Sequence, residues 1–368
     1  MRPVWWHRKN WASPSYSLTA PAPAAEPALL AAANVPAVQA GTETTAGDES
    51  TLRSAVAQNG AVIKLTAAIT LNSMLTIPED VSVTLDLNGQ TITANFSGSA
   101  IQIANGASLT LNDGAADGGG TITHANGKTG RGVYVKGAGS NNTSAAAFTM
   151  NGGTISGNTA SQTGNEEGGG VYVEGGLRTG MSGGTFTMNG GTITDNTAAS
   201  GGGVHLSDYC TFTMTGGEIT NNTASHSVVG NGGGVYVFRS NFTMTGGTIS
   251  GNHANVLGGG ISVSTLESYK FTMTGGEISG NSASDNGGGV FGGSPMTLSG
   301  SAKIINNKKG EAANNVCLAN GYGRIAIGEE GLTAGASIGV TSRDELGTGE
   351  STAIVSSGAT GDSMQYFT

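Results

Sequence analysis

The stretch Phe242–Asn252 reads FTMTGGTISGN, and close copies of this phrase recur along the chain of 368 residues. A second phrase, GGGVYV or a variant of it, lies between successive copies. The first phrase begins at residues 148, 186, 212, 242 and 271, with a degenerate MTL at 296, and the second begins at 168, 201, 232, 258 and 287. Self-similarity at a period of about 20–50 residues is typical of solenoids, propellers and arrays. The repeat therefore decides the fold.

Each repeat contains three short β-prone pieces, F-T-M, T-I-S and G-V-Y-V, with glycine and asparagine turns between them. Apolar and polar residues alternate in every piece, and helical periodicity is absent. Three such strands joined by tight turns form one triangular coil, and stacked coils pair their strands about 4.8 Å apart. The sequence thus predicts an all-β fold: a right-handed, single-stranded parallel β-helix (a solenoid) of roughly ten three-strand coils.

The alternation also assigns the inner face of each strand. It points Phe242, Met244 and Ile249 inward, together with the valines of the GGGVYV strand. One asparagine recurs at the same turn of five coils, namely Asn158, Asn196, Asn222, Asn252 and Asn281. Stacked asparagines can hydrogen-bond along a column, as in cross-β ladders. We interpret them as a structural ladder rather than as catalytic or ligand-binding residues.

The chain is predicted to have three segments. Degenerate coils extend the repeat in both directions, so residues 47–340 are assigned to the β-helix. The stretch DESTLRSAVAQNG (48–60) fits an amphipathic helix that caps the open end of the solenoid. Residues 1–46 are a Pro/Ala-rich segment, either a signal-like leader or a disordered linker. Residues 341–368 are a C-terminal tail, as in a truncated chain.

Composition excludes several classes of protein. Hydrophobic residues at 37% are too many for a charged disordered tail, and the 64 glycines lack the strict period of collagen. A net charge of −9 argues against nucleic acid or an anionic membrane as a partner. No apolar run is long enough for a membrane-spanning helix. Cys210 and Cys317 lie about four coils apart, roughly 19 Å, which is too far for a disulfide.

The repeated phrases, with VTLDLNGQTIT (83–93), resemble the bacterial adhesin-like β-helix surface proteins. These are relatives in fold of pectate lyase, and their phrases are similar to the GGA[IV] and FxxN repeats of polymorphic outer-membrane adhesins. The resemblance covers about residues 48–340 and is specific for the fold, whereas solenoids of this kind host binding, lysis and scaffolding alike. It implies an extracellular or cell-surface location, with glycans or host-surface proteins as partners. The chain would then be a monomer or part of a longer surface protein.

Catalytic chemistry has few candidates in the sequence. Relatives of pectate lyase need a carboxylate cluster for Ca²⁺ beside a basic residue, but the pair Glu166-Glu167 has no Arg or Lys near it in sequence. Glu218 and Glu277 share one outward position two coils apart, about 9.6 Å. That separation is marginal for a glycosidase pair, which needs roughly 5–9.5 Å. We therefore predict solvated surface glutamates and no catalytic residue.

Metal ligands are equally sparse. The histidines lie in different coils or on different faces without ligand spacing, so neither a metal site nor a cofactor is predicted. The residues considered are His124, His205, His226 and His253.

The alternative to a non-enzymatic binding protein is a carbohydrate-active enzyme, either a polysaccharide lyase or a glycoside hydrolase. Its site would lie in the irregular segments 136–147 or 160–185, because loops on a rigid scaffold usually carry function.

Two outward stripes remain as candidate binding surfaces. The middle position of the GGGVYV strand carries Tyr134, Tyr172, His205, Tyr236, Ser262 and Phe291. These side chains either stack on sugar rings or form an aromatic ladder that stabilises the sheet. The second stripe repeats Thr-x-Thr/Ser, as ice-binding proteins do, at Thr91, Thr93, Thr121, Thr123, Thr154, Ser156, Thr192, Thr194, Thr248 and Ser250. Glu218, Glu277 and Lys303 interrupt it, and threonine is also simply a good exposed strand residue.

The leading hypothesis is a non-enzymatic secreted or cell-surface adhesin-like β-helix that presents an extended face to glycans or a host surface. Many weak contacts in register along a rigid rod would give it avidity. Two or more carboxylates converging with an Arg or Lys in one groove would instead favour the enzyme, and smooth faces would exclude the lyase. Ice binding is the third alternative.

Overall fold

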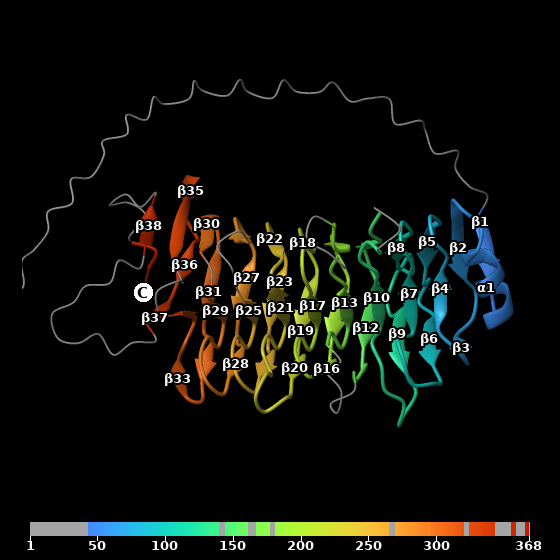
Figure 1. Ribbon diagram of the computed structural model, residues 1–368, viewed down its shortest axis with the longest axis horizontal. Coiled ribbons are helices and arrows are strands. Elements are labelled where there is room, and N and C mark those ends of the chain that lie inside the picture. Colours follow the sequence, from blue (N-terminus) through green and yellow to red (C-terminus); the bar gives the residue numbers. More distant parts are fainter. Residues whose placement is uncertain are drawn as a thin grey trace, which may run out of the picture. The chain divides into compact units, whose positions relative to one another are not determined.

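A computed structural model describes residues 43–139, 144–160, 167–176, 181–264, 269–293, 295–319, 324–342, 355–357 and 365–367. The chain divides into two units, 1–40 and 41–368, and the first lies outside the described residues, as does most of the predicted leader. The second unit is an all-β parallel solenoid of stacked coils with a single short helix among its described residues (Figure 1). The predicted fold class is confirmed.

Strands of successive coils pair to form four sheets, A to D, that run along the stack (Figure 1). Sheet A contains β1 (Glu43–Ala46), β2 (Ala61–Leu65), β5 (Ser82–Asp86), β8 (Ser108–Asn112), β11 (Ala147–Met150), β14 (Thr185–Met188), β18 (Thr211–Met214), β22 (Asn241–Met244), β26 (Phe271–Met273), β30 (Met296–Gly300), β35 (Ile325–Leu332) and β38 (Val355–Ser357). Sheet B contains β3 (Ile69–Leu71), β6 (Thr91–Ala94), β9 (Thr121–His124), β12 (Thr154–Ser156), β15 (Thr192–Thr194), β19 (Glu218–Thr220), β23 (Thr248–Ser250), β27 (Glu277–Ser279), β31 (Lys303–Ile305) and β36 (Ser337–Ile338).

Sheet C carries the GGGVYV strands and closes each coil. It contains β4 (Leu75–Ile77), β7 (Ile101–Ile103), β10 (Val133–Val135), β13 (Val171–Val173), β17 (Val204–Leu206), β21 (Val235–Phe238), β25 (Ile261–Ser264), β29 (Val290–Gly292), β34 (Val316–Leu318) and β37 (Val340–Ser342). Sheet D adds a short fourth strand to the central coils, with β16 (Thr197–Ala198), β20 (Thr223–Ala224), β24 (His253–Ala254), β28 (Ser282–Ala283), β32 (Lys308–Lys309) and β33 (Ala312–Ala313). The sequence analysis missed sheet D, whose central strands follow the ladder asparagines and bury one alanine each.

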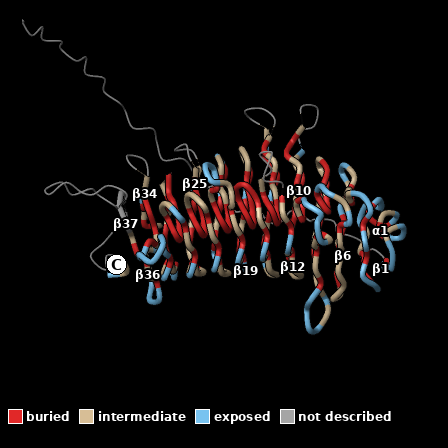
Figure 2. Tube along the Cα trace, turned by 90° about the horizontal axis from the view of Figure 1, so that it is seen from below, coloured by how far each residue is buried: buried red, intermediate tan, exposed pale blue. Residues whose placement is uncertain are grey.

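Parallel pairing in strict register stacks identical side chains into inner columns. Phe212, Phe242 and Phe271 are partners in sheet A, with ring centroids 4.6 and 5.3 Å apart. These rings are fully buried, as are Met244 and Ile249. The buried positions follow the stack from end to end (Figure 2). The inward assignment of the repeat is therefore confirmed.

Glycine is required where each coil turns into sheet C. Gly232 has φ +67°, which L side chains rarely adopt, and a Cβ there would lie 2.4 Å from the Val235 carbonyl oxygen. The first glycine of the other GGG phrases has the same backbone conformation. The first position of the GGG phrase therefore forms a corner of the coil that requires glycine.

Helix α1 (Glu49–Val56) covers the first coil, as the capping helix predicted from 48–60. The side chain of Asp48 accepts a hydrogen bond from the backbone N–H of Thr51 at 2.8 Å, within a capping box. Leu52, Ala55 and Val56 form its buried face. This face shields the apolar end of the solenoid from water.

The repeated asparagines form a buried column of hydrogen bonds. Each side-chain Nδ2 donates to Oδ1 of the asparagine in the next coil at 2.9–3.0 Å, and the backbone N–H of the same residue donates to that Oδ1 as well. The column contains the five expected residues Asn158, Asn196, Asn222, Asn252 and Asn281, and it continues through Asn307 to Asn315. All five expected members are at most 1% exposed, so no ligand reaches them from solvent.

The stack becomes irregular after β29. The pairing of β30 with β35 shifts register between Leu298 and Gly300, and β32 pairs with β33 in antiparallel fashion. The solenoid has about eight turns, a minor difference from the roughly ten expected, although sheets B and C each contain 10 strands.

Three further findings concern the ends of the stack, the cysteines and membrane-spanning helices. Strand β1 lies within the segment 1–46 and pairs with β2, while β38, in the expected tail 341–368, pairs with β35. Cys210 and Cys317 are both buried and do not form a disulfide, as predicted. Among the described residues, no helix has the length and apolar character to cross a membrane.

Candidate functional site

The predicted aromatic stripe lies on sheet C. Strands β10, β13, β17 and β21 are neighbours in the sheet (Figure 1) and pair Tyr134 with Tyr172, Tyr172 with His205, and His205 with Tyr236. Their ring centroids lie 5.5, 5.4 and 5.0 Å apart in the same order. The next two strands carry the stripe on to Ser262 and Phe291. The structure therefore brings all of these side chains together.

The stripe is not an open platform for sugar rings. The three tyrosines are half-buried, whereas His205, Ser262 and Phe291 are only 1%, 2% and 8% exposed. Arg131 lies over the Tyr172 ring and Glu167 contacts His205, so the outward direction of a strand residue did not ensure its exposure. The part of the stripe that remains accessible lies on β10, β13 and β21, which carry the half-buried tyrosines.

Arg131 covers the first two tyrosines. Its guanidinium carbon lies 4.6 Å from the ring centroid of Tyr172 and 5.5 Å from that of Tyr134. Its Nε donates a hydrogen bond to the backbone oxygen of Glu167 at 2.7 Å, which fixes the plane of the guanidinium. Cation–π contacts of this kind stabilise by about 0.5–2 kcal/mol. Arg131 thus links the aromatic stripe to the segment that leads into β13.

A phenol, an amine and a carboxylate form a triad beside Arg131. The hydroxyl of Tyr134 donates to Glu174 Oε1 at 2.6 Å, and Lys136 Nζ lies 3.0 Å from both that hydroxyl and Glu174 Oε2. Burial, and then the hydrogen bond to Glu174, raise the pKa of Tyr134. Although burial alone favours the neutral amine, hydrogen bonds with Tyr134 and Glu174 raise the pKa of Lys136. The triad therefore holds an ammonium and a protonated phenol against one carboxylate.

His205 and Glu167 form the second polar pair. His205 Nε2 lies 3.1 Å from Glu167 Oε2, with the histidine side chain 2% and the glutamate side chain 34% exposed. Burial lowers the pKa of His205 to about 3 and raises the pKa of Glu167. The imidazole is therefore neutral at physiological pH. While Glu167 is ionised, Nε2 must carry the proton that it donates, which leaves Nδ1 as an acceptor.

Two buried acceptors in this region have no donor. His205 Nδ1 and Asn231 Oδ1 make no hydrogen bond within the described part of the chain. Buried polar atoms in native proteins nearly always have a partner, and a bound water can supply one. These two atoms therefore mark a polar spot beneath the aromatic stripe.

The side chains around β10, β13, β17 and β21 are termed the charged aromatic patch. Its members are Arg131, Tyr134, Lys136, Glu167, Tyr172, Glu174, His205 and Tyr236. Two carboxylates and two cations meet on it, although the sequence offered Glu167 no basic neighbour. Lys136 and Glu174 directly follow register partners Val135 and Val173, so opposite charges one coil apart were a signal that the sequence analysis missed.

The segments expected to hold an enzymatic site contribute to this patch. Lys136 lies in 136–147, and Glu167, Tyr172 and Glu174 lie in 160–185. Residues 140–143, 161–166 and 177–180 of these segments, which include Glu166, lie outside the described residues. The described parts therefore join the irregular segments to the predicted aromatic stripe.

The remaining sequence candidates stay apart from the patch. Glu218 and Glu277 lie two coils apart in sheet B, with Thr248 between them in register. His124 belongs to the end of the asparagine column, and His253 contacts Ser282. In the described ranges, no group of three or more His, Cys, Asp or Glu side chains is placed to hold a metal ion.

Threonine ranks occur on two faces. On sheet B, Glu218, Glu277 and Lys303 take positions in the rank, as the sequence indicates. Sheet A carries an uninterrupted rank that the sequence analysis overlooked, formed by Thr84, Thr110, Thr149, Thr187, Thr213, Thr243, Thr272 and Thr297. These side chains are half-buried and stand in consecutive coils.

Comparison with protein-family models, curated proteins and solved structures finds no match to this chain. The structure shows the β-solenoid fold, the comparisons do not confirm an adhesin-like or pectate-lyase-like identity, and the function is argued from the patch.

Proposed function

We propose that this protein binds glycans through the charged aromatic patch and does not cleave them. Sugar rings present C–H faces to aromatic rings and hydroxyls to polar groups, and the patch offers both within three neighbouring coils. The observation that carries the proposal is the row of half-buried tyrosines Tyr134, Tyr172 and Tyr236, which lie in neighbouring coils beside Arg131 and Lys136. Such rings and cations provide stacking surfaces and hydrogen-bond donors for a glycan.

The balance of charges on the patch indicates whether it binds neutral or anionic glycans. Arg131 and Lys136 are balanced by Glu167 and Glu174, and each carboxylate already contacts a cationic or imidazole group. A strongly anionic polysaccharide would meet two carboxylates at the same place, so neutral glycans are favoured. We further propose an extracellular or cell-surface location, which follows from this ligand class and from the resemblance of the repeats.

A glycan array with the full chain tests the proposal. We expect binding to neutral glycans that Tyr172→Ala removes, because Tyr172 lies at the centre of the patch beneath Arg131. The matched control is Tyr269→Ala, which deletes a tyrosine that contacts Tyr209 instead of the patch. Unchanged binding by Tyr172→Ala with its normal melting temperature would reject the patch as the glycan site.

Polysaccharide cleavage is the second candidate. It is favoured because Glu167 and Glu174 converge with Arg131 and Lys136, the arrangement that the sequence analysis gives as favouring an enzyme, and because burial raises the pKa of Glu167. A depolymerisation assay that follows new reducing ends and unsaturated products separates the two functions. Turnover that Glu167→Gln abolishes without loss of glycan binding would establish the enzyme and overturn the non-enzymatic proposal.

Ice binding is the third candidate, and the uninterrupted threonine rank on sheet A favours it. Strands repeat about 4.8 Å apart along the rank, so its hydroxyl and methyl groups are regularly spaced. Thermal hysteresis of the purified protein tests this function. If present, it should be lost in Thr213→Lys, which breaks the rank on sheet A, and kept in Thr220→Lys on sheet B, where charges already interrupt the rank.

A further inference from the structure

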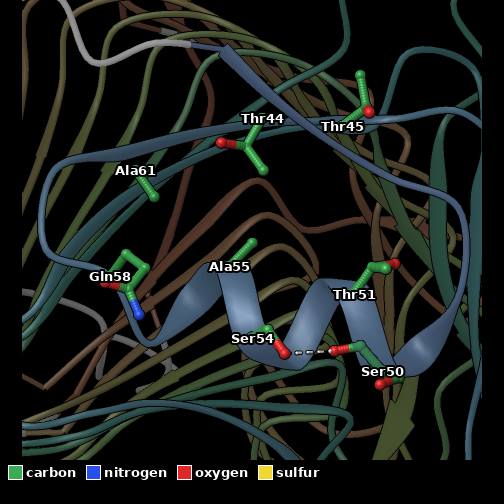
Figure 3. Close-up of a pocket in the computed structure, with 8 residues that line it drawn as sticks. All are labelled: Thr44, Thr45, Ser50, Thr51, Ser54, Ala55, Gln58 and Ala61. Carbon is green, nitrogen blue, oxygen red and sulfur yellow. Dashed lines mark hydrogen bonds between the residues drawn. The ribbon is translucent and has the colours of Figure 1, made fainter.

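A concave surface lies at the capped end of the solenoid, away from the charged aromatic patch. Helix α1 and strands β1 and β2 border an open cavity of about 360 Å³, most of whose lining residues are exposed (Figure 3). Its lining residues are Thr44, Thr45, Ser50, Thr51, Ser54, Ala55, Gln58 and Ala61. The volume falls within the roughly 300–1,000 Å³ of small-molecule sites.

The lining combines hydroxyls with a small apolar floor. Five residues carry a hydroxyl, Gln58 carries an amide, and none of the lining side chains is ionisable. Ser54 Oγ donates to the Ser50 carbonyl at 3.0 Å (Figure 3), whereas the side chains of Thr45, Ser50 and Gln58 make no hydrogen bond to the described part of the chain. These side chains can both donate to and accept from a ligand.

Neither helix capping nor helix propensity explains why small and hydroxyl-bearing residues line the cavity. The Glu49–Arg53 face of α1 is tied to the first coil, because Arg53 donates to the Ser73 side chain and to the Met74 carbonyl at 2.9 and 3.0 Å. Thr51 serves the capping box. Ser50 and Ser54 have no such task, and serine forms helices less well than the Lys or Glu usual on a solvated face. Their small size, with that of Ala55 and Ala61, keeps the cavity open.

We propose that this cavity binds a neutral saccharide, either a free monosaccharide or the end of a glycan chain. Uncharged hydroxyl and amide groups suit sugar hydroxyls, and the alanines with the threonine methyl groups provide contacts for sugar C–H groups. A charged ligand would meet no counter-charge on the lining. The site is independent of the function proposed for the patch.

Ligand-observed saturation-transfer NMR with the full chain and a panel of neutral mono- and disaccharides tests the proposal. We expect at least one sugar to bind the wild type, and binding to be lost in Ser54→Gln, whose longer side chain fills the cavity. Ala57→Gln is the matched control, because Ala57 is the exposed C-cap residue of the same helix and does not line the cavity. It should retain binding.

Three results would overturn the proposal: no panel sugar binds, Ser54→Gln binds like the wild type, or Ala57→Gln loses binding as fully as Ser54→Gln. Melting temperatures verify that both variants fold, and glutamine is at least as good a helix former as the serine that it replaces. Binding that disappears in Tyr172→Ala but persists in Ser54→Gln would assign the saccharide to the patch. The function proposed for the patch would then stand while the cavity site fails.

Discussion

Replacing Asn252 by alanine tests whether the buried asparagine column stabilises the solenoid. Its Oδ1 accepts from the backbone N and the Nδ2 of Asn222 at 2.9 and 3.0 Å. Its Nδ2 donates to the Ile219 carbonyl and to Asn281 Oδ1, both at 2.9 Å. The residue is fully buried, so water cannot replace these four hydrogen bonds without entering the core.

The expected loss of stability follows from the hydrogen-bonding groups that Asn252→Ala leaves without a partner. Nδ2 of Asn222 keeps two backbone carbonyls as partners, and Asn281 Oδ1 keeps the backbone N–H of residue 252. The backbone N–H of Asn222 and the carbonyl of Ile219 lose the partner that residue 252 supplied. A buried polar group left unmet costs about 1–3 kcal/mol, so Asn252→Ala should lower the free energy of unfolding by about 2–6 kcal/mol.

Asn189→Ala is the matched control for this measurement. Asn189 belongs to an exposed column, where its Nδ2 donates to Asn151 Oδ1 at 2.9 Å and its Oδ1 accepts from Thr215 Oγ1 at 2.8 Å. Water can replace both bonds, so the loss should stay below about 1 kcal/mol. Urea denaturation measures both variants, and hydrogen exchange locates the weakened coils. Equal losses in the two variants would refute the role of burial.

Three further predictions follow from buried side chains. Ile249→Asp places a charge in the inner column and should prevent folding, as circular dichroism would show, whereas Thr243→Ala on the outside of sheet A should leave the melting temperature unchanged. Because the folded state lowers the pKa of His205 from 6.5 to about 3, its contribution to stability is complete above about pH 6.5 and is lost as pH falls towards 3. His205→Gln should flatten this dependence in pH-dependent urea melts, and an unchanged dependence would contradict the lowered pKa. The ring nitrogens of His124 hydrogen-bond to Asn158 Oδ1 at 2.7 Å and to the Gly98 carbonyl at 2.8 Å, so His124→Ala should lower the melting temperature, and an unchanged melting temperature would contradict a stabilising role of these bonds.

The sequence predicted the interior of the solenoid better than its surface. Inner positions obey one rule, the alternation of a strand, and parallel pairing repeats that rule in every coil; Phe242 and Ile249 therefore lie where the pattern places them. The asparagine column followed from the same reasoning, because equal spacing from the strand puts equal side chains on top of one another. Sheet D escaped notice because two-residue strands are too short to show alternation.

The covering of the aromatic stripe could not be predicted in the same way. His205 points outward from its strand and is still 1% exposed, because Glu167 packs against it from the previous coil. Contacts of this kind join residues about one coil apart in sequence, and the interval between coils varies with each insertion. Arg131 and Glu167 are therefore remote in sequence and bonded in space. A search for basic residues near Glu167 along the chain was bound to miss this partner.

The charged aromatic patch lies where successive repeats differ from one another. A perfect repeat gives every outward column one residue type, which suits a ladder or a flat rank but cannot assemble acid, base and aromatic side chains at one place. The interval between the copies at 148 and 186 is 38 residues, the longest between successive copies, and the patch is built around it. Lys136 and Glu174 hold equivalent positions in adjacent coils with opposite charges, which a strict copy would have made alike. Functional variation in this solenoid is therefore expected where the coils diverge, and the regular coils beyond Tyr236 serve as the rigid support for it.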